Sequence, residues 1–373
     1  MNKNIQKAII VIFFSIIFLF AACLVFNHDK VVSNSENRIL ATFPELNWKT
    51  IKSGSFMDDF ETFVNDQITG RDWFVQLSTR TKILLGQKDI NGVYITDDSL
   101  YSKVHKLTDD QLSKVDKSNL QLIKFLQNTP NAYFGIIPTA IEFSSVDYPN
   151  KLNQQNFIDT VYEQLPATQT IDFYSILDTP EEVYYRTDHH WTTLGAYYGY
   201  QAIGDTVGFD TQKKEAYQVS SLKSDFSGTT QSKLNIPLFK DTIYQWTLHE
   251  ADEYTRVVND IMEYDSLYDL EKLDSSEPYA VFLGGNNGKV VVRNNSISEA
   301  RQGTKLLLIK DSYSHSLTPF LLEQYEEITL IDLRYAGMVS VQNLIKQENY
   351  DTILVLYNTE NYISETKLLF LNK

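Results

Sequence analysis

The sequence predicts an α/β domain with a mostly parallel sheet and helices on both faces, preceded by a helix that spans a membrane. Short apolar runs, typical of strands buried on both faces, alternate with segments of helical spacing in both halves of the chain. Residues 8–26 form an uncharged run that is apolar except for Ser15, long enough to cross about 30 Å of hydrocarbon. In a parallel sheet, reactive groups are expected beyond the carboxyl ends of the strands.

The first segment sets the expected compartment. Lys3 and Lys7 precede the apolar run and a long acidic remainder follows it, so the positive-inside rule predicts a cytoplasmic tail at residues 1–7 and a transmembrane anchor at 8–26. A cleaved signal peptide is one alternative. A lipoprotein, with lipid on Cys23, is another. All three interpretations place residues from about 30 onward outside the cytoplasmic membrane.

The chain after the anchor begins with a polar, irregular stretch, residues 27–54, which we interpret as a stalk. The extracytoplasmic domain is predicted to occupy residues 55–373. Its first predicted elements are two helices within residues 55–85 that separate near Gly70, a strand at 93–95, and a helix at 108–126 with Thr108 as its N-cap.

The remaining elements alternate between apolar runs and helical spacing. Predicted strands lie at residues 132–138, 170–173, 305–309, 328–332 and 352–356. Predicted helices lie at residues 153–165, 193–207, 316–325 and 339–347. Residues 210–300 are less regular, so we expect an insertion there. This alternation is the basis for the predicted α/β class.

Composition excludes several classes of protein. Forty-eight acidic and 33 basic residues give a net charge of −15, which opposes binding to nucleic acid. The single cysteine excludes an intramolecular disulfide framework and a cysteine-rich metal site. At 43% hydrophobic and 22% charged residues, the chain is typical of a folded globular protein, and its 23 Tyr and 21 Phe residues can build a large core.

The first chemically suggestive motif lies just before the predicted helix at 193–207. Asp188 stands two residues before His190, on an irregular approach to that helix. An aspartate so placed can accept the imidazole Nδ1 hydrogen and leave Nε2 as a general base. A structural role is the alternative for His190, and is the favoured one for His189.

The second motif directly follows the most apolar strand of the second half. A serine at a strand-to-helix turn is exposed at the edge of the sheet, near helix amides that can stabilise an oxyanion. Ser312 is therefore the candidate nucleophile. Ser314 and Ser316 are alternatives that helix capping explains equally well. His315 is a competing candidate for the base.

Weaker signals suggest further site residues. Gly285 and Asn286 lie in a glycine-rich turn that can bring an amide to a carbonyl oxygen, although the same pattern fits an ordinary turn. Arg334, two residues beyond a predicted strand, can hold a carboxylate or an acyl oxygen, or form a surface ion pair. Gly228 is a similar candidate for an oxyanion or substrate-binding element.

The motif from Thr187 to Thr192 contains Asp-His-His-Trp at residues 188–191, and so resembles the tetrapeptide for which bacterial DHHW proteins are named. Other blocks of the chain look like recurring blocks of that family: Glu36-Asn37-Arg38 with Leu40 and Pro44, Asp66-Gln67 with Arg71-Asp72, Asn91-Gly92-Val93-Tyr94, Gly284-Gly285-Asn286, and Asp311-Ser312-Tyr313-Ser314. The family is similar to the SGNH-hydrolase-like domains of alginate O-acetylation proteins, which implies a flavodoxin-like sheet. The resemblance implies that Asp188 orients His190, that His190 is the base, and that Ser312 is the nucleophile. Lys310 departs from the glycine usual before the Asp-Ser pair, which puts the tightness of that turn in doubt.

These observations together predict a membrane-anchored, extracytoplasmic serine O-acetyltransferase or acetylesterase that acts on cell-envelope polysaccharide without a metal or other cofactor. Acetyl-CoA is absent outside the membrane, so an acetyl donor must be supplied through the membrane by a partner. The resemblance implies that this partner is a membrane-bound O-acyltransferase. One alternative is a non-catalytic carbohydrate-binding or assembly protein. Another is a metal-dependent phosphoesterase of the DHH type, whose further aspartate and histidine motifs the sequence lacks.

Overall fold

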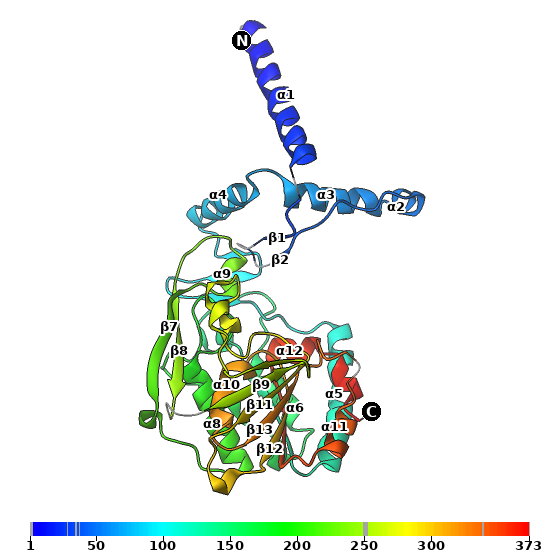
Figure 1. The fold of residues 1–373 in the computed structure, drawn as a ribbon. Coiled ribbons are helices and arrows are strands. Elements are labelled where there is room, and N and C mark those ends of the chain that lie inside the picture. The colour runs from blue at the N-terminus through cyan, green and yellow to red at the C-terminus, as the bar shows by residue number, and fades with distance from the viewer. Residues whose placement is uncertain are drawn as a thin grey trace. The chain divides into compact units, whose positions relative to one another are not determined.

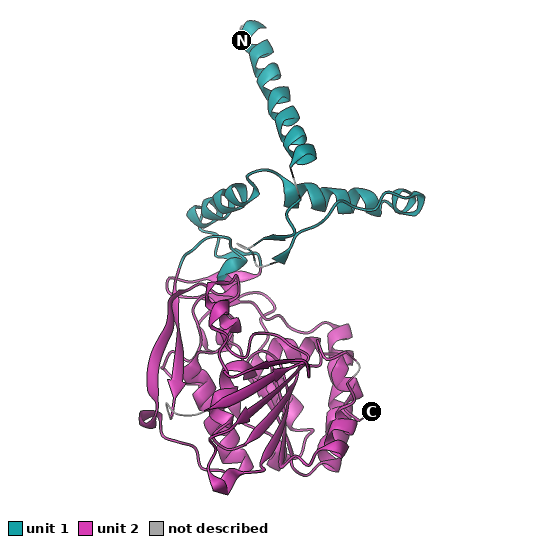
Figure 2. Ribbon diagram, in the orientation of Figure 1, with its two compact units in different colours: residues 1–91, 231–238 teal, residues 92–230, 239–373 magenta. Residues whose placement is uncertain are grey.

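The chain forms two compact units, residues 1–91 with 231–238, and residues 92–230 with 239–373 (Figure 2). The structure is a computed structural model that describes residues 3–27, 29–33, 36, 38–248, 253–337 and 339–372. Some residues of the predicted tail and stalk lie outside the described residues, namely Met1, Asn2, His28, Asn34, Ser35 and Asn37.

The N-terminal unit begins with helix α1 (Lys3–Phe26), which is long and apolar enough to cross a membrane. None of its residues is buried against the rest of the chain. A signal sequence has the same length and composition, so this helix fits either a membrane anchor or a signal sequence.

Three further helices make up most of the N-terminal unit. They are α2 (Trp48–Ser53), α3 (Ser55–Gln67) and α4 (Arg71–Leu84), and three two-residue strands accompany them, β1 (Val32–Ser33), β2 (Arg38–Ile39) and β3 (Asp89–Ile90). Asn47 caps α2 through a reciprocal pair of hydrogen bonds with Thr50. The predicted break near Gly70 is confirmed, because Gly70 adopts a left-handed φ of 77° between α3 and α4.

The second unit is built on a seven-stranded sheet with the strand order β10-β9-β11-β13-β12-β14-β6 (Figure 1). Strands β13, β12, β14 and β6 are parallel neighbours. Strands β10, β9 and β11 run antiparallel to their neighbours. The bounds are β6 (Ala132–Ile137), β9 (Tyr254–Val258), β10 (Met262–Tyr264), β11 (Lys289–Asn294), β12 (Lys305–Lys310), β13 (Glu327–Ile331) and β14 (Thr352–Asn358).

The predicted α/β class is confirmed, but the prediction of a mostly parallel sheet is wrong. The additional strands β9, β10 and β11 come from the region that looked irregular in the sequence. Only three residues, 259–261, join β9 to β10. A parallel pair needs a crossover of a dozen or more residues, so such a short link forces an antiparallel hairpin.

Helices cover both faces of the sheet (Figure 1). On β12, Leu306 and Leu308 join a core with α8 and α10, whereas Leu307 and Ile309 join a second core with α5, α6, α11 and α12. This alternation makes β12 apolar on both faces. The helices are α5 (Asp109–Asn128), α6 (Gln154–Tyr162), α7 (Phe173–Leu177), α8 (Thr193–Val207), α10 (Ser314–Leu321), α11 (Val341–Gln347) and α12 (Thr359–Ser364), with α9 (Thr229–Ser232) where the chain passes between units.

Shorter elements complete the second unit. Two hairpins, β4 (Val93–Ile95) with β5 (Leu100–Ser102) and β7 (Gln218–Phe226) with β8 (Asp241–Thr247), are antiparallel. The predicted strand at 170–173 is reduced to a parallel bridge between Thr170 and Phe134 of β6. It goes no further because Asp172 accepts a hydrogen bond from the Ser175 amide and caps α7. Short 3-10 helices are η1 (Ala140–Phe143), η2 (Ala167–Gln169), η3 (Lys214–Ala216), η4 (Leu270–Asp274), η5 (Pro278–Val281), η6 (Glu299–Arg301) and η7 (Lys367–Phe370).

Candidate active site

Two loops bring together the residues that the sequence singles out. In the first, Tyr184 pairs with Trp191 as an isolated antiparallel bridge, and the loop ends at Thr192, the N-cap of α8. Asp188 and His190 therefore lie near the tip of a closed loop. In the second, Ser312 stands between the end of β12 and the start of α10, at the carboxyl edge of the parallel strands.

The side chains of Asp188, His190 and Ser312 form a continuous hydrogen-bonded chain. His190 Nε2 lies 2.7 Å from Ser312 Oγ, and His190 Nδ1 lies 2.5 Å from Asp188 Oδ1. The three residues are 2%, 1% and 7% exposed in chain order. Such a chain can move the serine proton to the imidazole while the carboxylate stabilises the imidazolium.

The carboxylate of Asp188 is held by more than the imidazole. Its Oδ2 accepts hydrogen bonds from the Thr229 amide at 2.7 Å and from Thr229 Oγ1 at 2.9 Å. Burial by itself would raise the pKa of Asp188, but the charges of His189 and His190 and these hydrogen bonds lower it below its usual range. Asp188 is therefore an ionised hydrogen-bond acceptor at neutral pH.

Gly228 lies against Asp188. A Cβ atom at this position would lie 2.3 Å from the Asp188 Cβ and 2.5 Å from its Oδ2. The Gly228 amide donates a hydrogen bond to Thr187 Oγ1 at 3.0 Å. This placement favours a role in seating the carboxylate over the oxyanion or substrate-binding role that the sequence suggested.

Aromatic residues fix the imidazole of His190. The Tyr279 ring stacks on it with centroids 3.8 Å apart and an interplanar angle of 8°. The Tyr279 hydroxyl is 2.9 Å from Ser316 Oγ, which also accepts a hydrogen bond from Trp191 Nε1 at 3.1 Å. Sequence analysis missed Tyr279, in η5, and Thr229, at the start of α9, because both are far along the chain from His190 and no local motif marks them.

The alternative serines have other surroundings. Ser316 Oγ contacts Trp191 and Tyr279, as described above. Ser314 Oγ is buried and has no hydrogen-bond partner among the described residues. His190 Nε2 thus pairs with the Ser312 hydroxyl and with neither serine of α10.

Behind Ser312 lies a buried network that begins at Lys310. Lys310 Nζ donates to His315 Nε2 at 2.7 Å and lies 3.4 Å from Asp332 Oδ2. Burial lowers the pKa of Lys310. Burial and the neighbouring Lys310 hold the pKa of His315 well below its usual range, so His315 is a neutral acceptor for Lys310 and not a base for Ser312.

Arg334 belongs to the same network. Its Nε and Nη2 donate to the two carboxylate oxygens of Asp332, at 2.9 and 2.7 Å, and its Nη1 lies 3.4 Å from Asn361 Oδ1. Asn361 in turn donates to Asp311 Oδ2 at 2.9 Å. Arg334 thus forms an ion pair with a buried partner, Asp332, and its expected role in holding a substrate carboxylate or acyl oxygen stays a prediction.

The neutral His315 gives a prediction about pH. Because its folded pKa lies below the unfolded value near 6.5, the unfolded chain takes up a proton that the folded chain excludes, and stability is lost as pH falls below about 6.5. The contribution is at most about 1.4 kcal/mol per pH unit. His315→Gln, which can still accept from Lys310, should show a shallower fall in the free energy of unfolding between about pH 7 and pH 5. Denaturant titrations measure this, and equal slopes for the two proteins would contradict it.

The glycine-rich turn lies near the sheet, but its amides are partly used. Gly285 has a left-handed φ of 89° and donates its amide hydrogen to the Phe282 carbonyl at 3.3 Å. Asn286 is exposed. Neither residue hydrogen-bonds to Ser312 in the described part of the chain, so their oxyanion role stays a prediction.

A metal-ligating arrangement is geometrically available at the same place. Ligand atoms of Asp188, His189 and His190 lie within 4.8 Å of one another. Both ring nitrogens of His190 already have partners, and His189 Nδ1 lies 2.7 Å from Thr229 Oγ1. A metal bound here would have to break the link between His190 and Asp188, so the observed contacts favour proton transfer.

Comparisons with known proteins identify the family of the chain and structures with a similar fold. The family model described as DHHW protein matches residues 86–331. No curated protein matches the chain.

Among solved structures, a DHHW family protein from Eubacterium siraeum DSM 15702 has a TM-score of 0.63 and 22% identity, over 75% of this chain and 95% of that one. Bacillus cereus PatB1 with a sulfonyl adduct has a TM-score of 0.60 and 19% identity, over 75% of this chain and 98% of that one. These identities show a shared fold alone. The O-acetyltransferase domain of Pseudomonas putida AlgJ is a weaker match, with a TM-score of 0.46 and 15% identity over 74% of this chain and 93% of that one.

Proposed function

The chain belongs to the DHHW protein family, and from this premise we propose that it is a membrane-anchored, extracytoplasmic serine O-acetyltransferase or acetylesterase that acts on cell-envelope polysaccharide. The observation that carries the proposal is the chain of contacts from Ser312 Oγ through His190 to Asp188. An Asp-x-His pair that precedes the serine, and a serine at the end of β12, also support an SGNH-hydrolase-like assignment.

In the proposed first half-reaction, His190 Nε2 removes the Ser312 hydroxyl proton as Oγ attacks the acetyl carbonyl of the donor. The new C–O bond forms while the carbonyl π pair moves to oxygen. The tetrahedral intermediate then expels the donor alcohol, which takes the proton back from His190, and leaves acetyl-Ser312. Throughout, Asp188 accepts the His190 Nδ1 hydrogen and stabilises the imidazolium.

In the second half-reaction, a sugar hydroxyl gives its proton to His190 and attacks acetyl-Ser312. Collapse of the second intermediate releases the acetylated sugar and returns the proton to Ser312 Oγ. Water in place of the sugar gives hydrolysis by the same steps. The choice between transferase and esterase is thus a choice of acceptor.

The oxyanion needs donors near Ser312 Oγ. We assign the Ser312 amide as the first, because it makes no hydrogen bond in the described residues. Gly285 and Asn286 are the proposed further donors. The Gly285 amide would have to exchange its 3.3 Å contact with the Phe282 carbonyl for the oxyanion.

The membrane context rests on α1. With Lys3 and Lys7 on its cytoplasmic side, α1 would anchor the rest of the chain outside the membrane. A donor would then have to be delivered through the membrane, and we propose a membrane-bound O-acyltransferase as the partner that delivers it.

The experiment that tests this function uses the full chain in detergent with p-nitrophenyl acetate as donor and an envelope oligosaccharide as acceptor. We expect acetylated oligosaccharide by mass spectrometry, together with release of p-nitrophenol. A parent protein that neither transfers nor hydrolyses acetyl groups, yet binds the oligosaccharide, would contradict the proposal and favour the carbohydrate-binding alternative.

Gly228→Ala tests whether Gly228 leaves the space that the Asp188 side chain occupies. The added Cβ cannot fit beside Asp188, so the carboxylate must shift, and a shift of about 1 Å is enough to cost about 100-fold in rate. We measure p-nitrophenyl acetate hydrolysis per folded molecule, with the folded fraction from circular dichroism. The control is Gly208→Ala, whose Cβ enters open space at a φ of 93° and which should lose about 1–2 kcal/mol of stability but keep its rate. Equal rates in the two variants would contradict the assigned role of Gly228.

A further inference from the structure

Helix α4 carries an exposed apolar surface that the proposed chemistry does not use. Five large apolar side chains on and just after the helix are exposed, and we call them the α4 apolar face: Trp73 61%, Phe74 44%, Leu77 48%, Leu84 87% and Leu85 81%. At 100° per residue, these positions fall within an arc of about 120°. Thr79, the buried residue of α4, lies on the opposite side.

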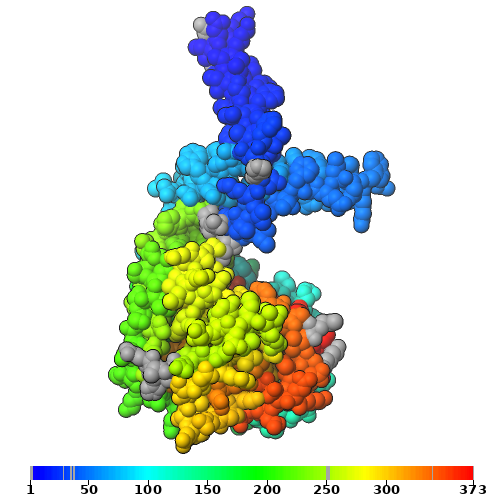
Figure 3. Space-filling model, viewed as in Figure 1, coloured from blue at the N-terminus to red at the C-terminus, as the bar shows by residue number. Residues whose placement is uncertain are grey.

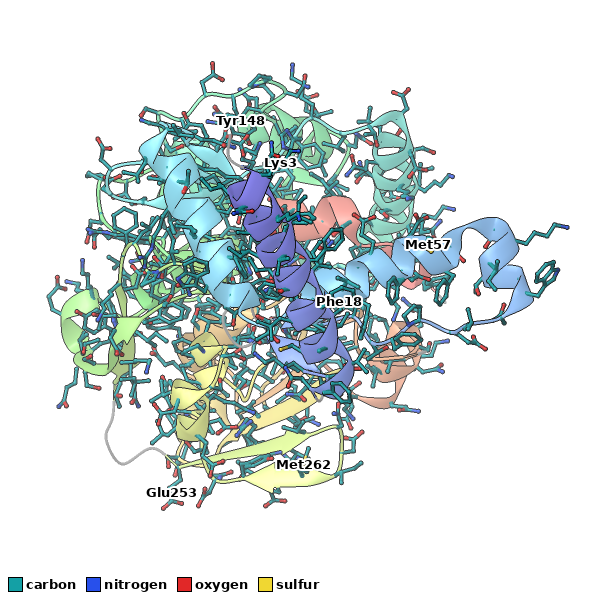
Figure 4. All side chains as sticks on the ribbon, turned by 90° about the horizontal axis from the view of Figure 1, so that it is seen from above. Lys3, Phe18, Met57, Tyr148, Glu253 and Met262 are labelled. Atoms are coloured by element: carbon teal, nitrogen blue, oxygen red, sulfur yellow. The ribbon has the colours of Figure 1, made fainter. Side chains whose placement is uncertain are left out.

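Helices α2 and α3 of the same unit expose further large apolar side chains. Trp48 and Ile51 on α2 are 78% and 49% exposed, and Met57 on α3 is 63% exposed. Figure 3 shows the atoms of these helices at the surface, and Figure 4 labels Met57 on α3 and Phe18 on α1. The Trp, Phe and Leu side chains on one arc of α4 are more than scattered surface apolar residues, and such a patch marks an interaction surface.

The contact between α1 and α4 indicates what covers the α4 apolar face. The rings of Phe20 and Phe74 lie 6.1 Å apart, and Asn27 Nδ2 donates to Thr69 Oγ1 at 3.1 Å. Phe20 stands six residues before the end of α1, which is about 9 Å along the helix axis. When α1 crosses the bilayer, Phe74 therefore lies at the same depth as the apolar residues near the end of α1.

A set of polar contacts fixes this arrangement after α1 ends. Lys30 and Gln67 exchange two hydrogen bonds of 2.9 Å between the Lys30 backbone and the Gln67 side chain. Arg38 donates to the buried Asp66 through Nη1 and Nη2, and Arg71 Nη2 donates to Glu36 at 2.8 Å. The Arg38 hydrogen bond lowers the pKa of Asp66, so the Arg38–Asp66 pair stays charged at neutral pH. Helices α3 and α4 are thus tied to the residues that leave α1, rather than joined to them by a loose linker.

We propose that the α4 apolar face lies in the outer interfacial layer of the lipid bilayer that α1 crosses. The inference rests on the proposed anchoring by α1. Tryptophan is enriched at membrane interfaces, and an amphipathic helix binds there through a buried apolar face. Arg80, which borders the face, is exposed and placed to meet lipid phosphates. The occupant is lipid rather than a second protein, because the face is continuous with the helix that enters the bilayer.

The test measures depth in the membrane by fluorescence. The full chain is placed in vesicles of phosphatidylcholine and phosphatidylglycerol that hold no other protein, with single cysteines carrying an environment-sensitive dye. The parent is labelled at Cys23, which reports the insertion of α1. In a Cys23→Ala background, Leu77→Cys and Leu84→Cys probe the face, Lys82→Cys is the control on another side of α4, and Asp225→Cys reports water.

We expect nitroxide lipids to quench the labels at positions 77 and 84 at least about threefold more than those at 82 and 225. Quenching at 77 and 84 no greater than at 225, while Cys23 is quenched, overturns the inference and leaves the anchor standing. An unquenched Cys23 label overturns both proposals. Labels at 77 and 84 that are shielded from water but not reached by lipid nitroxide show a protein contact instead, which also overturns the lipid assignment.

Discussion

Ser312→Ala is expected to lower the rate of acetyl transfer by at least about 10³-fold while leaving the fold intact. The change removes the only hydroxyl that His190 Nε2 contacts in the described residues, and with it the proposed acetyl-Ser312 intermediate. The side chain is small and Ser312 Oγ donates no other side-chain hydrogen bond described here, so little packing is lost. Rates with p-nitrophenyl acetate and an oligosaccharide acceptor, with circular dichroism spectra, measure the effect.

Ser314→Ala is the matched control for that variant. Ser314 lies two residues farther on, and its buried hydroxyl has no partner in the described part of the chain, so its loss should cost neither rate nor stability. A Ser312→Ala protein that folds and keeps more than about a tenth of the parent rate would contradict the assignment, as would a Ser314→Ala protein that loses its activity.

Asp188→Asn is expected to lower the rate by about 10³- to 10⁴-fold. An asparagine can turn its NH₂ group toward His190, which then holds the wrong tautomer and leaves no base for Ser312. Because the pKa of Asp188 is held below its usual value of 3.8, the parent carboxylate is ionised above about pH 4, and the ratio of parent to variant rates should stay constant there. Rate–pH profiles of the two proteins measure this.

The control is Asp172→Asn, because Asp172 caps α7 and asparagine caps a helix equally well. It should keep both stability and rate. A folded Asp188→Asn protein with full activity would remove Asp188 from the proposed mechanism. A rate ratio that changes steeply above pH 4 would mean that Asp188 itself titrates in that range.

Much of the sheet could be predicted from the sequence because its centre is buried on both faces. The runs that became β6, β12, β13 and β14 are nearly continuous in apolar residues, a pattern that few other structures produce. Strands β9 and β11 were missed because Arg256 and Arg293 interrupt their apolar residues and their pairing depends on distant partners. The strand predicted at 170–173 was too long, because its first residue pairs with β6 whereas the side chain of Asp172 caps α7.

The residues of the candidate site were likewise predicted only in part. Asp188, His190 and Ser312 stood out because each lies in a short motif with its own chemical logic, although 122 positions separate His190 from Ser312. Tyr279 and Thr229 could not be found, because stacking on an imidazole and donating to a carboxylate leave no spacing in the sequence. The burial of Lys310 against His315 and Asp332 was likewise invisible, since only the fold brings those side chains together.

The most direct test of the central claim, that Ser312 is a nucleophile activated by His190, is the site of a sulfonyl adduct on the full chain. One structural neighbour, Bacillus cereus PatB1, was solved with such an adduct. After treatment with a sulfonyl fluoride and proteolysis, peptide mass spectrometry should place the adduct on Ser312, and His190→Ala should suppress it. An adduct on Ser314 or Ser316, or labelling of Ser312 that is unchanged in His190→Ala, would contradict the account.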